Sequence, residues 1–141
     1  MPSRFRSRQT ALQTLFAWDV RRIGIDQALS DFYGSLGIED EEPVEPERDY
    51  FADDLARGVA AAAPELDEII GRHSEHWRLD RMPILDRNIL RLAVYELKHM
   101  PTPTAVIIDQ ALELARRFSN DDSIAFLNGV LDAANRELRP P

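Results

Sequence analysis

Residues 85–99 read Leu-Asp-Arg-Asn-Ile-Leu-Arg-Leu-Ala-Val-Tyr-Glu-Leu-Lys-His, and this stretch decides the fold expected for the chain. Its apolar residues recur every three or four positions and cover most of the circumference of a helix. They are Ile89, Leu90, Leu92, Ala93, Val94 and Leu97. A helix that is apolar nearly all round must be enclosed by other elements. We therefore expect residues 85–99 to form the central helix.

The rest of the chain shows the same helical spacing, and no stretch keeps a period of two. We predict an all-α protein of about seven helices. The expected ranges are 8–22, 26–36, 48–62, 64–77, 85–99, 104–118 and 123–138. Pro64 opens the fourth of these, because proline suits the first position of a helix. A connector at 78–84 divides the chain into an N-terminal subdomain, 1–78, and a C-terminal one, 79–141, of a single domain.

Composition excludes several classes of function. The chain has 141 residues, no cysteine and a net charge of −8. Disulfides, zinc-thiolate sites and cysteine nucleophiles are therefore ruled out. Because no apolar run approaches the roughly 20 residues of a membrane span and no signal peptide is evident, we expect a cytoplasmic protein without a membrane partner. The acidic stretch 39–49 contains two prolines, and we expect a solvated loop there.

Candidate catalytic groups are few, and each has a structural explanation. His73 and His76 are three residues apart and could share a metal, but a third ligand and the HExxH spacing are missing. Asp109 and Glu113 lie one turn apart, yet Arg116 and Arg117 follow and can pair with them on a solvated face. Phosphate-binding loops and serine elbows are absent as well. We expect no catalytic residue, metal or cofactor.

Positive charge gathers at the N-terminal end of the chain. Residues 1–24 contain five arginines and a single acid, which gives them +4 and leaves −12 for the rest of the chain. The arginines are Arg4, Arg6, Arg8, Arg21 and Arg22. A local phosphate site in an otherwise acidic protein needs this segregation. A basic terminus that merely improves solubility explains the composition equally well.

Aromatic residues also bear on whether the chain binds RNA, because single-stranded RNA is held by base stacking as well as by phosphate contacts. Trp18 falls at the edge of the apolar stripe of the first helix. Phe126 projects about 100° away from Leu127, which lies on the apolar face of the last helix. Phe126 therefore lies off the main core stripe. It either stacks on a base or packs against the other subdomain, and periodicity leaves both possibilities open.

Three C-terminal segments together resemble the signature of the NusB family. They are Asp86-Arg-Asn-Ile-Leu-Arg-Leu-Ala-Val-Tyr-Glu-Leu97, Ile107-Ile-Asp-Gln-Ala-Leu-Glu-Leu-Ala-Arg-Arg-Phe118 and Phe126-Leu-Asn-Gly-Val-Leu-Asp132. The first helix, Arg8-Gln-Thr-Ala-Leu-Gln-Thr-Leu-Phe-Ala-Trp18, is similar to that family's arginine-rich opening. The resemblance spans nearly the whole chain.

The resemblance implies two small perpendicular helical bundles and a role in transcription antitermination and ribosomal RNA transcription, without catalysis. Its implied partners are boxA-type single-stranded RNA, the ribosomal protein NusE and the transcription elongation complex, with a homodimer in some members. Carried over by position, the RNA-binding residues are Arg4, Arg6, Arg8, Phe16, Trp18, His73, Asp122 and Phe126. Asp86 and neighbouring exposed positions are the implied partner-binding surface.

Two other functions compete with this one. RNA cytosine methyltransferases can begin with a NusB-like domain that positions RNA, but no Rossmann-type strand pattern or cofactor loop follows here. A protein-interaction module without RNA affinity is the other alternative. The cluster of Arg4, Arg6 and Arg8 speaks against it, and a binding assay at two salt concentrations would decide.

Overall fold

The computed structural model describes residues 3–36, 47–75 and 77–141, and every regular element in these ranges is a helix. The elements are α1 (Arg4–Arg21), α2 (Ile25–Leu36), α3 (Tyr50–His73), the short 3₁₀ helix η1 (Leu79–Arg81), α4 (Ile84–His99), α5 (Thr104–Phe118) and α6 (Asp121–Leu138). The predicted all-α class is confirmed. Most of the acidic stretch 39–49 lies outside the described residues.

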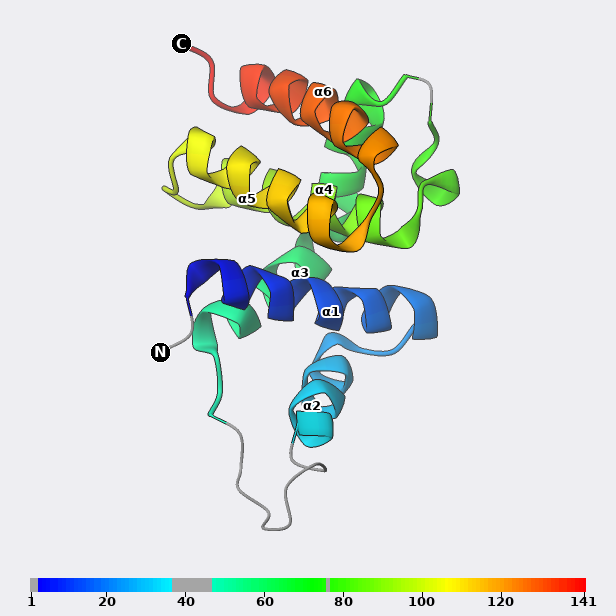
Figure 1. Ribbon diagram of the computed structural model, residues 1–141, viewed down its shortest axis with the longest axis vertical. Coiled ribbons are helices and arrows are strands. Elements are labelled where there is room, and N and C mark those ends of the chain that lie inside the picture. The colour runs from blue at the N-terminus through cyan, green and yellow to red at the C-terminus, as the bar shows by residue number, and fades with distance from the viewer. Residues whose placement is uncertain (1–2, 37–46, 76) are drawn as a thin grey trace.

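α4 is the central helix of the molecule, as its sequence predicts. It contacts α1, α3, α5 and α6, and its apolar residues Ile89, Leu90 and Val94 are fully buried. In Figure 1, α5 and α6 lie above α1 and α2, and α3 runs behind α1 up to the level of α6. Because α3 contacts helices of both groups, it joins the two halves of the fold. The subdomain boundary at 78–84 stays a prediction.

The predicted break at Pro64 is wrong. α3 continues through Pro64 and ends at His73, whereas the sequence suggests one helix up to residue 62 and another from Pro64 to Trp77. The proline ring is exposed, while Ala63 and Leu66 on either side of it are buried. Packing of this inner face outweighs the loss of one backbone hydrogen bond, so the helix is not interrupted.

A charged network fastens α1 to α4. Asp19 of α1 accepts hydrogen bonds from Arg87 at 2.7 Å and from Arg91 at 2.9 Å, and Arg91 also binds Asp67 of α3 at 2.7 Å. Burial alone would raise the pKa of Asp19, but hydrogen bonds from Arg87 and Asn88 outweigh it and lower that pKa. The carboxylate therefore stays ionised and joins α1 to α4, and Arg91 extends this network to α3. Among the described helices, none combines the length and apolar character that crossing a bilayer requires.

Candidate nucleic-acid interface

The start of α1 carries two of the predicted arginines on the surface. Ser3 caps the helix by accepting a hydrogen bond from the backbone N–H of Arg6 at 3.1 Å. Arg4 and Arg6 are exposed, and the Arg4 guanidinium lies 3.8 Å from the centre of the Phe51 ring. Both cations therefore face solvent, where a phosphate can reach them.

Arg8 does not share this exposure, so the arginine cluster implied by the resemblance lies only partly on the surface. Its side chain is 5% exposed, and its Nε and Nη2 donate to the two carboxylate oxygens of Glu96 at 2.8 and 2.7 Å. Position 8 precedes Ala11 and Leu12 by three and four residues, so it lies on the buried face of α1. Arg8 thus joins α1 to α4 in a buried bidentate ion pair.

Phe16 and Trp18 face different surroundings, although both belong to α1. Phe16 is 38% exposed and lines an apolar hollow of about 550 Å³ with Leu85 and Phe118. Trp18 is half-buried against the core, with the Arg91 guanidinium 5.6 Å from its ring. The structure therefore does not present these two rings as one stacking surface.

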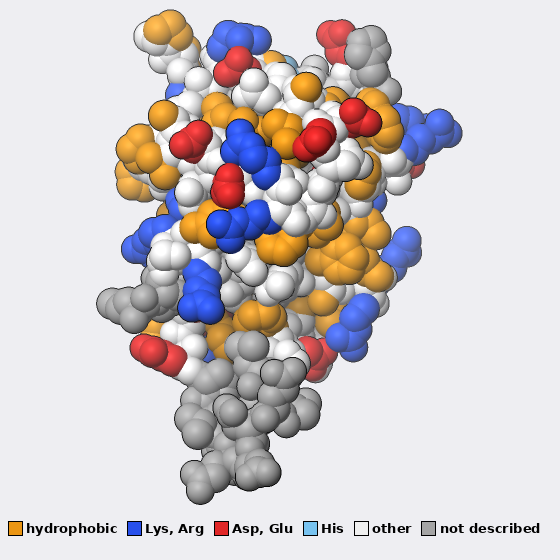
Figure 2. Space-filling view, viewed as in Figure 1, with side chains coloured by type: hydrophobic (Ala, Val, Ile, Leu, Met, Phe, Trp, Pro, Cys, Tyr) orange, Lys and Arg blue, Asp and Glu red, His pale blue; other side chains and the backbone are white. Residues whose placement is uncertain are grey.

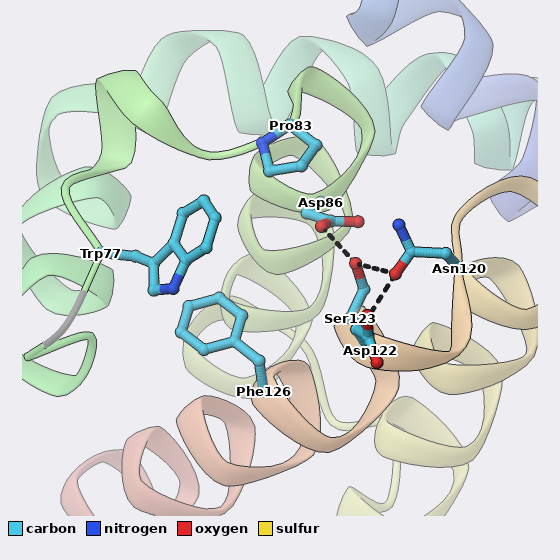
Figure 3. A pocket seen from close by; sticks show the side chains of 7 residues that line it. All are labelled: Trp77, Pro83, Asp86, Asn120, Asp122, Ser123 and Phe126. Carbon is cyan, nitrogen blue, oxygen red and sulfur yellow. Dashed lines mark hydrogen bonds between the residues drawn. The ribbon is translucent and has the colours of Figure 1, made fainter.

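Asp122 and Phe126 line a second hollow, of about 370 Å³, where α6 begins. Figure 3 shows Phe126 beside Trp77 on one side of this hollow and Asn120, Ser123 and Asp86 on the other. The two ring centroids are 6.2 Å apart with an interplanar angle of 46°. Phe126 is half-buried, so it packs against Trp77 and also faces the hollow. We call this cavity the α6 hollow.

Asp86 lies in the wall of the α6 hollow, and the expectation that it belongs to an exposed acidic surface is wrong. It is 2% exposed and accepts hydrogen bonds from the hydroxyls of Ser119 and Ser123, each at 2.7 Å. The carboxylate therefore ties the start of α4 to the start of α6. By fixing the first turn of α6, it also sets the position of Phe126.

His73 lies at the opposite end of α6 from Phe126. Its Nε2 is 2.9 Å from Glu137 Oε1, and Arg72 donates two hydrogen bonds to the same carboxylate, at 3.0 and 2.7 Å. The hydrogen bonds from Arg72 and His73 lower the pKa of Glu137 to about 2. Glu137 follows Phe126 by eleven residues, about 16 Å along a helix, so His73 and the α6 hollow form no single site.

The structure adds basic and aromatic residues that the sequence alone does not assign. Arg116 and Arg117 pair with Glu113 at 3.2 and 3.3 Å, as the helical spacing predicts. The Arg117 guanidinium also lies 4.5 Å from the centre of the Phe5 ring, which brings a further cation to the start of α1.

The sequence predicts Trp77 only as the last residue of a helix. Its contact with Phe126 depends on the path of the connector before α4, which periodicity does not reveal.

Comparison with known proteins shows what the chain is similar to. A family model described as the NusB family matches residues 6–136. A transcription antitermination protein NusB of Solibacter usitatus is 54% identical over 141 residues, covering 100% of this chain and 94% of that protein. The corresponding protein of Anaeromyxobacter dehalogenans strain 2CP-1 is 47% identical over 137 residues, covering 97% and 93%.

Solved structures resemble the fold over nearly its whole length. NusB of T. maritima superimposes with a TM-score of 0.84 at 33% identity, covering 99% of this chain and 94% of that one. A chain from a crystal structure of the antitermination factors NusB and NusE in complex with double-stranded RNA gives a TM-score of 0.78 at 25% identity, with 96% and 99% covered.

Proposed function

The chain belongs to the NusB family, and from this membership we propose that it is a transcription antitermination factor that binds boxA-type single-stranded RNA together with the ribosomal protein NusE. A factor of this kind is not an enzyme. It acts by holding an RNA element and a protein partner on the transcription elongation complex, in the cytoplasm.

The observation that carries the RNA-binding proposal is the α6 hollow. Its volume of about 370 Å³ falls in the range of pockets that hold small ligands. Phe126 supplies a ring face there, and unpaired bases of single-stranded RNA are held by stacking on such rings. Phe126 is therefore the residue that we expect to contact a base.

Phosphate contacts are expected at the start of α1. Arg4 and Arg6 are exposed there, and Arg117 extends the charge onto the end of α5. Because the chain as a whole is acidic, attraction for phosphate has to be local. Arg8 contributes indirectly, since its ion pair with Glu96 holds the start of α1 against α4.

The protein partner is expected at the apolar hollow of Phe16, Leu85 and Phe118. Phe16 and Phe118 are 38% and 36% exposed, and Figure 2 shows hydrophobic side chains gathered over the C-terminal half of α1 and the end of α5. Exposed aromatic clusters of this kind mark protein interfaces. NusE is the proposed occupant, and a second copy of the chain, as in a homodimer, is the alternative.

Replacing Phe126 by alanine tests the RNA-binding function. If the ring stacks on a base, RNA affinity falls by about 1–3 kcal/mol and folding stability changes little. If the ring serves only to fill the contact with Trp77, stability falls by about 3–5 kcal/mol and affinity of the folded protein is unchanged. Titration of boxA-containing RNA and thermal unfolding of the same variant separate the two. Phe126→Trp is the matched control, because it keeps a stacking surface.

A further inference from the structure

Trp77 is an exposed aromatic residue that lines two hollows. Its side chain is 48% exposed. It forms one wall of the α6 hollow with Phe126, and it also lines a neighbouring cavity of about 490 Å³ with Gly71, Arg78 and Leu79. We call this second cavity the connector hollow. A ligand can therefore approach the indole ring from two sides.

We propose that Trp77 is a second base-stacking residue, and that bound RNA runs from the α6 hollow across Trp77 to Arg78. The inference rests on the proposed RNA-binding function and extends its footprint onto the connector between α3 and α4. Trp77 and Phe126 already contact each other, with centroids 6.2 Å apart, so no base fits between them. The two rings act instead as one aromatic wall.

The opposite side of the α6 hollow is suited to the edge of a base. Asn120 Oδ1 accepts a hydrogen bond from the backbone N–H of Ser123 at 3.1 Å, and the Ser123 hydroxyl donates to Asp86. The amide nitrogen consequently points away from Ser123, toward the Asp86 side of the hollow, as Figure 3 shows. It offers a donor to a carbonyl or ring nitrogen of a base that lies against the aromatic wall.

Charge decides which part of a nucleotide enters the α6 hollow. Asp86 and Asp122 line it, and no arginine or lysine does among the described residues. These carboxylates repel a phosphate but accept a neutral base. The RNA backbone therefore passes outside the α6 hollow. Arg78, which lines the connector hollow with Glu75 and Asp80, is the exposed cation that a phosphate can reach there. Arg78 pairs with Asp80 at 3.4 Å, with both side chains largely exposed, and such a pair competes weakly with phosphate.

The test uses the full chain and a single-stranded RNA that contains boxA. We expect Trp77→Ala to weaken binding about 5- to 150-fold, the loss of one stacked base, without changing the salt dependence. Trp77→Phe should retain most of the affinity, because a phenyl ring still stacks. Arg78→Ala should lower the salt slope by about 0.7, the value for one neutralised phosphate on a single strand. Val106→Ala, which truncates a 43% exposed residue of α5, is the control.

A series of RNAs with one abasic nucleotide each locates the stacked base. One position should lose affinity in the parent protein but lose nothing further in Trp77→Ala, because the stacking partner is already gone. Tryptophan emission should also be quenched by RNA in the parent and not in Trp77→Phe. Parental affinity and the same abasic profile in Trp77→Ala would overturn the inference while leaving RNA binding intact. Failure of the parent protein to bind the RNA would instead refute the proposed function.

Discussion

At the scale of single residues, Arg4 and Arg8 show how one helix face gives two different roles. They lie one turn apart, and their guanidinium groups are 3.8 and 5.6 Å from the centre of the Phe51 ring. Arg8 reaches Glu96 of the central helix and is buried, whereas Arg4 lies at the free end of α1. The same residue type therefore serves packing at one position and offers charge to a ligand at the other.

Arg8→Ala should be a structural lesion. It leaves the Glu96 carboxylate, 2% exposed, without its charged partner, and breaking a buried ion pair costs about 3–5 kcal/mol of folding free energy. Arg4→Ala with Arg6→Ala should leave stability unchanged and weaken RNA binding, with the salt slope reduced by about 0.7 for each phosphate that the protein no longer neutralises. Chemical denaturation and RNA titrations at several salt concentrations measure both effects. Equal stability of the two variants would contradict the division of roles.

The sequence could predict surface pairs but not buried ones. The pairing of Glu113 with Arg116 and Arg117 follows from positions within one helix. Arg8 finds its carboxylate 88 residues away, and Asp86 finds the Ser123 hydroxyl 37 residues away. Local periodicity contains no information about such partners. Arg8 and Asp86 are both buried, and what the sequence does not reveal is the distant partner that makes burial of each charge possible.

At the scale of helices, the sequence predicts the elements well and one boundary poorly. The central position of α4 follows from an apolar surface that covers nearly its whole circumference. Pro64 was expected to start a new helix, because proline lacks the N–H donor of a helix interior. The exposed side of α3 tolerates it, since the buried side keeps its packing through Ala63 and Leu66. Tertiary packing thus overrides the local signal.

Gly58 of α3 is a close-contact position between helices. A β-carbon built there would overlap the ring of Tyr95 on α4. Alanine in a helix interior normally stabilises by about 0.5–1 kcal/mol relative to glycine, but Gly58→Ala should destabilise, because the Tyr95 ring must move. Gly129→Ala in α6 is the matched control, since nothing lies within 4 Å of its added carbon. The melting temperature should fall for Gly58→Ala and rise for Gly129→Ala. A higher melting temperature for Gly58→Ala would show that an added methyl group fits between α3 and α4.

At the scale of the whole molecule, the fold builds three surfaces from different residues. Exposed arginines lie at the start of α1, the α6 hollow lies at the start of α6, and residues of α1, α2, α4 and α5 line the apolar hollow of Phe16 and Phe118. The sequence indicates some residues of each surface. It does not show which of these residues come together, because α4 brings α1 and α5 close to each other only in the folded chain. Phe16, assigned to RNA by resemblance, lines the apolar hollow with Phe118, whereas Phe126 lines the α6 hollow.

Because no residue lines both the α6 hollow and the apolar hollow, partner binding and RNA binding should be open to impairment one at a time. Phe118→Ser should weaken association with NusE by about 2 kcal/mol or more, the usual effect of truncating a central interface aromatic. RNA binding by the chain alone should stay at the parental level.

Asp86→Asn is the contrasting variant. It removes the charged acceptor of two serine hydroxyls, so it should lower folding stability by about 1–3 kcal/mol rather than act at an interface. Calorimetry with NusE, RNA titration and thermal unfolding would measure the three quantities. Solution mass would show whether a second copy covers the apolar hollow instead. Parental affinity for NusE in Phe118→Ser, together with a change in mass from dimer to monomer, would assign the hollow to self-association and move the NusE site elsewhere.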